Sequence, residues 1–240
     1  MSVKDEEHFA TCSNDSSIKT WIKIREDFYK EDKVIPNAHE KSVRKVKYRE
    51  NNDLISCSWD HSVKIWVLIN GSYKNIKKLE HKDAINCVFV APDINTLISA
   101  GVGGTRLWKL NDYKEICYIQ DTYCHGKNTL NRLDNDRFII GGRKDGNIKV
   151  ISVKKQKIEK EDIYNGFQCF CICVTRDQKN FLIGGKDKII NVYSCLDYKL
   201  QYSVQDVHDS YVRGIINLND GSIASYSDDK TIKIYKLNNQ

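Results

Sequence analysis

A fourteen-residue pattern that recurs along the chain constrains the fold more than any other feature of the sequence. Residues 53–66, DLISCSWDHSVKIW, combine a short apolar run, a polar turn at Asp60-His61 and an alternating run that ends on Trp66. Apolar alternation on both sides of a short polar turn predicts a β-hairpin. Five further copies lie at residues 8–21, 95–108, 138–151, 180–193 and 222–235.

The copies keep a nearly constant spacing. Counted from the turn aspartate, the equivalent positions are 15, 60, 102, 145, 187 and 229, separated by 45, 42, 43, 42 and 42 residues. Position 102 is a valine, so one copy lacks the aspartate. A strand–turn–strand unit that repeats every ~40–45 residues is typical of β-propeller blades. We therefore expect an all-β chain that forms a single propeller domain over residues 1–240, with six recognisable blades.

A histidine stands at a fixed distance before four of these turns. His39, His81 and His208 lie 21 residues before positions 60, 102 and 229, and His125 lies 20 residues before position 145. With this landmark the chain resembles the tryptophan-aspartate (WD) repeat family over essentially residues 8–236. The resemblance rests on spacing, because the family's signature dipeptides Gly-His and Trp-Asp are replaced here, the first by Ala38-His39, Glu80-His81 and Val207-His208.

The two ends of the chain differ from the middle units. Before His8 the sequence leaves no room for an inner strand, and after the hairpin 222–235 the chain ends at Gln240 without an outer strand. We therefore expect irregular closure of the propeller, or a chain that starts inside a longer one. In the middle units, lysine-rich stretches at 29–35, 72–79 and 154–162 predict outer edge strands, and apolar stretches at 43–48, 84–90, 168–174 and 211–218 predict inner strands.

The composition restricts the class of protein. Residues 1–7 contain no apolar run, which argues against a signal peptide, and no stretch approaches the ~18 apolar residues of a membrane span. The nine cysteines are odd in number and fall within strand-like runs, so we expect small reduced thiols in the core. These features predict a cytoplasmic protein, with a nuclear location also open.

One repeated set of polar residues invites a catalytic interpretation. His39, Ser56 and Asp60 are the residue types of a hydrolytic triad, and His208, Ser225 and Asp229 repeat them. An active site is normally built once, whereas a hydrogen-bond network inside each blade must recur. The resemblance implies such a structural network, completed by Trp66 in one copy and Tyr235 in the other. In three units Val102, Ile151 and Gly166 replace the expected Asp, Trp and His, so we expect those blades to be softer.

No catalytic, metal or cofactor site emerges from the remaining motifs. Cys169, Cys171 and Cys173 alternate along one predicted strand, so we expect them on one face, where they cannot converge on a zinc ion. Gly101, Gly103 and Gly104 form a glycine-rich turn, but no GK[ST] follows it. A shortened hairpin explains the glycines better than a phosphate-binding loop.

Candidate binding residues come from positions that, in the resembled family, lie on the top face of the propeller. These are the residue before the turn aspartate and the start of the inner strand. Trp59 is the most informative, because tryptophan is enriched among interface hot spots; packing on a neighbouring loop is the alternative. The predicted partner-binding set is Trp59, Arg44, Arg143, Lys144, Lys186, Tyr211 and Arg213.

These observations favour a non-catalytic scaffold or adaptor that binds other proteins within a larger complex. One alternative is a receptor for acidic or phosphorylated motifs, of the ubiquitin-ligase substrate-receptor type, because the predicted set is basic. Another is an RNA-associated WD-repeat protein, suggested by 38 basic against 32 acidic residues. The charges are interleaved rather than clustered, which disfavours nucleic acid. An enzyme with a small-molecule substrate is the least favoured class.

Overall fold

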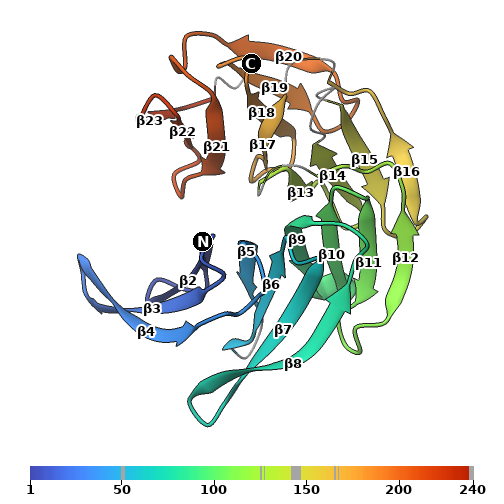
Figure 1. Cartoon of the computed structure of the whole chain (residues 1–240). Helices are drawn as coiled ribbons and strands as arrows, with labels where there is room; N and C mark the ends of the chain where they lie inside the picture. The colour runs from blue at the N-terminus through green and yellow to red at the C-terminus, as the bar shows by residue number, and fades with distance from the viewer. Residues whose placement is uncertain are drawn as a thin grey trace. The chain divides into compact units, whose positions relative to one another are not determined.

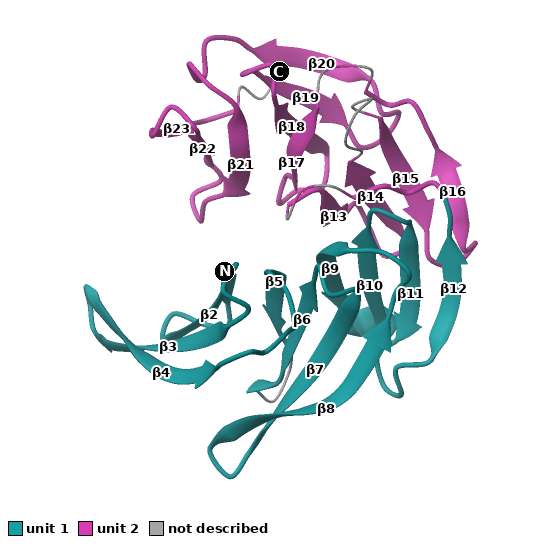
Figure 2. Cartoon of the chain, in the orientation of Figure 1, with its two compact units in different colours: residues 1–120 teal, residues 121–240 magenta. Residues whose placement is uncertain are grey.

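The computed structural model describes residues 1–49, 52–124, 126, 128–141, 147–164, 166 and 168–237. The chain divides into two compact units, residues 1–120 and 121–240, which Figure 2 distinguishes by colour. Apart from a 3-10 turn at Pro92–Ile94, the described regular structure consists of antiparallel β-strands. None of the described helices is long and apolar enough to cross a membrane.

Unit 1 contains three four-stranded sheets, which we call blades 1 to 3 (Figure 1). Blade 1 comprises β1 (Ser2–Val3), β2 (His8–Cys12), β3 (Ile18–Arg25) and β4 (Phe28–Ile35). Blade 2 comprises β5 (Val43–Tyr48), β6 (Leu54–Ser58), β7 (Ser62–Ile69) and β8 (Ser72–Glu80). Blade 3 comprises β9 (Ile85–Ala91), β10 (Thr96–Gly101), β11 (Thr105–Lys109) and β12 (Glu115–Ile119). In each blade the strands pair in chain order.

Unit 2 contains blades 4 to 6, built in the same order. Blade 4 comprises β13 (Leu130–Arg132), β14 (Arg137–Gly141), β15 (Ile148–Ser152) and β16 (Lys157–Lys160). Blade 5 comprises β17 (Cys169–Val174), β18 (Asn180–Gly185), β19 (Ile190–Ser194) and β20 (Leu200–Val204). Blade 6 has three strands among the described residues, β21 (Val212–Asn217), β22 (Ile223–Ser227) and β23 (Ile232–Tyr235).

The prediction of an all-β propeller with six blades is confirmed. The prediction that no inner strand fits before His8 is wrong, because Ser2 and Val3 pair with Ala10 and Phe9. The connection is short because the Asp5 carboxylate accepts the backbone N–H groups of Glu7 and His8, at 2.9 and 2.7 Å, and so reverses the chain within four residues. A single domain over 1–240 and irregular closure stay predictions.

The repeated hairpin turns share a backbone feature. The residue after the turn aspartate has a positive φ in four blades: 71° at Ser16, 69° at His61, 67° at Lys188 and 68° at Lys230. This left-handed conformation lets the chain reverse within the few residues between two strands. The recurring Asp-X pair therefore has a geometric basis in the turn itself.

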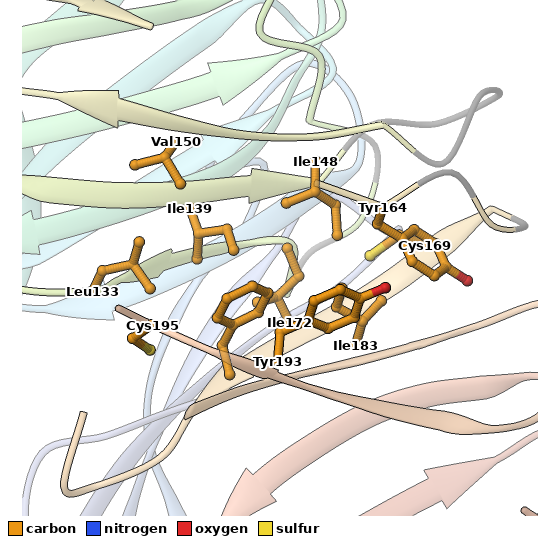
Figure 3. Close-up of a cluster of buried hydrophobic side chains, with 11 residues drawn as sticks. Leu133, Ile139, Ile148, Val150, Tyr164, Cys169, Ile172, Ile183, Tyr193 and Cys195 are labelled. Atoms are coloured by element: carbon orange, nitrogen blue, oxygen red, sulfur yellow. The ribbon is translucent and has the colours of Figure 1, made fainter. Parts of the chain in front are cut away.

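The core consists of apolar layers between neighbouring blades of the same unit. Figure 3 shows the layer between blades 4 and 5, where Ile139, Val150, Ile172, Ile183 and Tyr193 meet. Similar layers join blades 1 and 2, blades 2 and 3, and blades 5 and 6. Each blade is thus buried through side chains that alternate across its strands.

The cysteines correct one expectation. All nine lie outside disulfides, and seven of them are buried. Cys169, however, packs in the layer shared with blade 4, whereas Cys171 and Cys173 pack in the layer shared with blade 6. The expectation of one common face is wrong because the register of β17 shifts between Cys169 and Cys171, leaving Phe170 as an extra residue that moves Cys169 to the opposite face.

Candidate partner-binding surface

A β-bulge recurs at the start of the inner strands. The register against the second strand skips one residue at Arg44 in β5, Asn86 in β9, Phe170 in β17 and Arg213 in β21. A bulge re-aims the side chain of its extra residue. Here the four side chains reach neighbouring aromatic or polar groups, and they define the two clusters described next.

The unit 1 cluster consists of Arg44, Trp59 and Asn86. Trp59, just before the turn aspartate of blade 2, is 43% exposed. Its indole N–H donates to the Asn86 side-chain oxygen at 2.9 Å, and its ring lies 4.4 Å from the Arg44 guanidinium carbon. Burial lowers the pKa of Arg44, and Arg44 Nε is buried without a hydrogen-bond partner among the described residues. Trp59 thus contacts a neighbouring blade, as the packing interpretation expects, and remains partly exposed; its binding role stays a prediction.

The unit 2 cluster consists of Phe170, Tyr211, Arg213 and Asp228. The Arg213 guanidinium carbon lies 4.4 Å from the Phe170 ring and 5.4 Å from the Tyr211 ring. Arg213 also forms an ion pair with Asp228 at 2.5 Å, and hydrogen bonding to Asp228 raises the pKa of Arg213. Since this carboxylate balances the arginine, the cluster is aromatic and polar rather than strongly basic.

The other predicted binding residues are less informative. Lys186 is exposed at the turn of blade 5, where its backbone N–H donates to the Gln168 carbonyl at 3.0 Å. Arg143 and Lys144 lie outside the described residues. The sequence prediction thus included Arg44, Trp59, Tyr211 and Arg213 but missed Asn86 and Phe170.

The hydrogen-bond set of blade 2 forms a continuous chain. His39 contacts the Asp60 carboxylate through Nδ1 at 2.8 Å and the Ser56 hydroxyl through Nε2 at 2.7 Å, and Trp66 Nε1 donates to the same hydroxyl at 2.8 Å. Burial alone would raise the pKa of Asp60, but hydrogen bonds from His39 and Ser62 outweigh it and leave the pKa lowered. Burial lowers the pKa of His39, which favours the neutral ring. Because an ionised carboxylate only accepts, His39 Nδ1 carries the hydrogen in its contact with Asp60.

Blade 6 repeats this chain with one difference. His208 contacts Asp229 at 2.8 Å and Ser225 at 2.8 Å, as His39 contacts its partners. The Tyr235 hydroxyl is buried but finds no hydrogen-bond partner within the described part of the chain. Tyr235 therefore contributes packing in the position where Trp66 donates a hydrogen bond.

Two other blades keep parts of the set. In blade 3, His81 and Trp108 both hydrogen-bond to the Ser99 hydroxyl at 2.7 Å, although Val102 replaces the aspartate. In blade 1, Trp21 donates to the Thr11 hydroxyl at 2.9 Å. Asp145 and His125 of blade 4 lie outside the described residues. The serine–tryptophan half of the set therefore survives without the aspartate.

Blade 5 replaces the histidine with a residue that the sequence did not reveal. Gly166 occupies the expected position, but the buried Tyr164 donates its hydroxyl to Asp187 at 2.8 Å. Its ring meets Tyr193 edge-on, with centroids 6.3 Å apart. A tyrosine two residues before the expected histidine was the available signal.

Comparison with known proteins agrees with this geometry. A model of the WD domain, G-beta repeat, matches residues 32–67 and 199–236, the two stretches that hold the complete His–Ser–Asp sets. The chain is 25% identical to the small ribosomal subunit protein RACK1 of Caenorhabditis elegans over 176 residues, which cover 67% of this chain and 52% of that protein. It is 33% identical to the protein of the same name from Drosophila melanogaster over 88 residues, 35% of this chain and 27% of that protein.

The chain is a β-propeller that contains WD repeats. Its matches span about half of the worm relative and about a quarter of the fly relative.

In this WD-repeat protein the triad-like set cannot serve as a hydrolytic site. Ser56 is 0% exposed and His39 is 2% exposed, and the serine oxygen already accepts from Trp66. A nucleophile must be within reach of its substrate, and this buried serine is not. Among the described residues no group of three or more His, Cys, Asp or Glu side chains could hold a metal ion. The geometry suits a rigid support for surface clusters.

Proposed function

We propose that this WD-repeat protein is a non-catalytic interaction scaffold that holds a segment of a partner protein against the unit 1 cluster. The observation that carries the proposal is Trp59: the residue is 43% exposed, yet its ring contacts Arg44 and Asn86. A large aromatic side chain that is held before binding loses little conformational entropy on binding. Tryptophan and arginine are also the residues most enriched among interface hot spots.

Substitution of Trp59 tests this proposal. We expect Trp59→Ala to weaken capture of the partner by roughly thirtyfold, about 2 kcal/mol, as is common for a central hot spot. The melting temperature should change little, because much of the ring faces solvent. Affinity purification with cross-linking mass spectrometry would identify the partner and the contacting residues, and a titration with the purified partner would measure the loss.

Ile76 provides a matched control within the same unit. It is 51% exposed on β8, away from the turn that carries Trp59. Ile76→Ala should therefore leave capture unchanged. Equal capture by wild type and Trp59→Ala, with both proteins folded by circular dichroism, would reject the unit 1 cluster as the binding surface.

A second candidate is association with the small ribosomal subunit in the cytoplasm. Its support is that both relatives compared above are, by name, small ribosomal subunit proteins. Co-sedimentation of the purified chain with small subunits on a sucrose gradient tests it directly. We expect co-sedimentation at physiological salt that Trp59→Ala weakens; absence of the chain from the subunit fraction would reject this candidate.

The alternative of an acidic or phosphorylated ligand gains less support. The charge of Arg213 is already neutralised by the ion pair with Asp228. Lys186 is the one described member of the predicted set on its turn, so the described residues there do not form a basic patch. Among the described residues of the set, Arg44 Nε lacks a hydrogen-bond acceptor, but this atom is buried and so is not open to an acidic ligand. A panel of phosphorylated and unphosphorylated peptides would show a preference only if this alternative holds.

A further inference from the structure

A lysine and a cysteine from neighbouring blades are in direct contact inside unit 1. Lys45 lies on β5 and Cys87 on β9, the inner strands of blades 2 and 3, which lie side by side (Figure 1). The Lys45 ammonium group donates to the Cys87 sulfur at 3.1 Å. Neither the hydrogen-bond networks of the blades nor the two surface clusters use this contact.

A second lysine adds to the positive charge around the sulfur. Lys47 follows Lys45 by two residues in a regular part of β5, so both side chains leave the strand on the same face. Burial lowers the pKa of Lys47, the charge of Lys45 lowers it further, and Cys87 acts in the opposite direction. The two amines and the thiol therefore share one environment.

Cys57 provides a comparison within the same unit. It lies opposite Lys45 in the pairing of β5 with β6 and, like Cys87, it is 0% exposed. Burial raises the pKa of Cys57 well above its usual range, and the nearby Cys87 raises it further. The described residues place no lysine nitrogen within hydrogen-bond distance of the Cys57 sulfur. We therefore expect Cys57 to remain a protonated and unreactive thiol.

We propose that hydrogen peroxide converts the contact between Lys45 and Cys87 into a covalent link that joins blades 2 and 3. In the first step the Cys87 thiolate attacks one oxygen of the peroxide. An S–O bond forms and the O–O bond breaks, so the sulfur is oxidised by two electrons and the peroxide is reduced. The Lys45 ammonium group gives a proton to the departing hydroxide, which leaves a sulfenic acid, one water molecule and a neutral amine.

The second step needs no further oxidant. The neutral Lys45 amine attacks the Cys87 sulfur, an S–N bond forms and the S–O bond breaks. The hydroxide that leaves takes one proton from the nitrogen and departs as water, so the product is a sulfenamide. A sulfenic acid condenses in this way with a nitrogen nucleophile beside it, and here the nitrogen is already in contact with the sulfur. An added thiol reverses the link by attacking the sulfur and releasing the amine.

Burial restricts which oxidant can reach the sulfur. Cys87 is 0% exposed whereas Lys45 is partly exposed, so the reaction requires a small oxidant and a local opening of the structure. The link would hold together the two strands that carry Arg44 and Asn86, which contact Trp59. Its formation does not depend on the proposed role of Trp59.

Peptide mapping of the folded chain after treatment with hydrogen peroxide tests the link. We expect mass spectrometry to find the peptides of Lys45 and Cys87 joined, and dithiothreitol to separate them. Lys45→Arg keeps the positive charge but supplies no nucleophilic amine, so dimedone should then trap Cys87 as the sulfenic acid. Lys47→Arg is the matched control on the same strand and should leave the yield of joined peptides unchanged.

The rate of oxidation tests the role of the ammonium group. Lys45→Met should slow the oxidation of Cys87 about tenfold, because a cation beside a sulfur favours the thiolate that attacks the peroxide. The proposal is overturned if Cys87 in the wild type is oxidised no faster than Cys57, or if it forms a disulfide or a lasting sulfenic acid instead of the link. Equal yields of joined peptides from the folded chain and from the chain unfolded in urea would also overturn it.

Discussion

Ser56 is a single small side chain on which three elements converge. Its hydroxyl joins His39, which precedes β5, to Trp66 on β7, while the serine itself lies on β6. The side chains of His39, Ser56, Asp60 and Trp66 all have hydrogen-bond partners within this set, so the set adds stability without leaving one of its own polar groups unsatisfied. Removing one member should therefore cost more than the bond it makes, because the remaining members stay buried.

Asp60 and Asp15 provide a direct test of this argument. Asp60→Ala removes the acceptor of His39, and we expect it to lower the free energy of unfolding by about 1–3 kcal/mol. Asp15 occupies the same turn position in blade 1 but is exposed and accepts from Ser17. Asp15→Ala should cost no more than about 0.5 kcal/mol. Chemical denaturation measures both, and equal losses would contradict a special role for the buried network.

His81 should make stability depend on pH. Burial, helped by the positive charge of Arg106, lowers the pKa of His81 to about 3. A histidine in the unfolded chain takes up a proton below a pKa of about 6.5, so the unfolded state gains protons that the folded state excludes. Its contribution to stability is complete above that pH and is lost progressively as the pH falls towards 3.

The expected size can be measured by substitution. Between pH 7.5 and 5.0 the wild type should lose about 2 kcal/mol more of its unfolding free energy than His81→Gln. Comparing the two slopes removes the contribution of the other titrating groups. Parallel slopes would show that His81 titrates alike in the folded and unfolded states.

Individual residues could be predicted from the sequence where they recur at a fixed spacing in the repeat. His39, Ser56, Asp60 and Trp66 recur at fixed distances, and the structure joins them by hydrogen bonds. Tyr164 was missed because it fills the place of a histidine from a different position in the repeat. The part that Tyr235 takes in the network stays a prediction, since residue type alone does not determine where its hydroxyl oxygen lies.

At the scale of elements, blade 3 differs from blade 2 by the length of one hairpin. Trp66 follows its serine partner by ten residues, whereas Trp108 follows Ser99 by nine. The predicted shortening around Gly101, Gly103 and Gly104 is therefore present, and the turn lacks an aspartate. A turn without these side-chain bonds should open more easily.

Amide hydrogen exchange tests this difference. We expect the amides of residues 97–108 to exchange faster than those of residues 54–66 in the native protein. In the second segment Asp60 accepts hydrogen bonds from the backbone of Glu40 and Ser62, whereas the first segment has Val102 at that position. Exchange of residues 222–235, whose Asp229 makes similar bonds, serves as a second reference. Faster exchange in the hairpin of blade 2 would contradict the prediction.

The bulges were beyond the reach of sequence reasoning for a physical reason. A bulge is defined by the register between two strands, and neither strand alone shows which residue is extra. The apolar alternation of residues 168–174 even suggested a regular strand. As a result Asn86 and Phe170 went unnoticed, although each occupies the same place in its strand as Arg44 and Arg213.

At the scale of the whole molecule, the charge is balanced locally. Although basic residues outnumber acidic ones by 38 to 32, pairs such as Lys19–Glu31, Lys149–Glu161 and Arg213–Asp228 place opposite charges together. A surface of this kind attracts nucleic acid only weakly. The overall charge is thus a poor guide to the partner.

This balance predicts weak binding to RNA alone. At physiological salt we expect a dissociation constant above about 1 μM for unstructured RNA, and the affinity should fall further as the salt concentration rises. Fluorescence anisotropy with a labelled oligonucleotide measures it. Tight, salt-insensitive binding would instead support the RNA-associated alternative.

The six-blade architecture was the most predictable property of the molecule. Its evidence is a period of 42–45 residues, which depends on many positions and survives the loss of any one landmark. The short β1 strand escaped detection because two residues carry no periodic signal. The pattern of repeats therefore determines the fold far better than it determines the surface.

The left-handed turn residues have a consequence for engineering. Ser16, His61, Lys188 and Lys230 each hold a side chain in a backbone conformation that costs roughly 1 kcal/mol for residues other than glycine and asparagine. Asparagine at these four places should recover a part of that cost, about 0.5 kcal/mol each, which thermal melting of the fourfold variant can measure. The repeat thus offers the same thermostabilising substitution four times over.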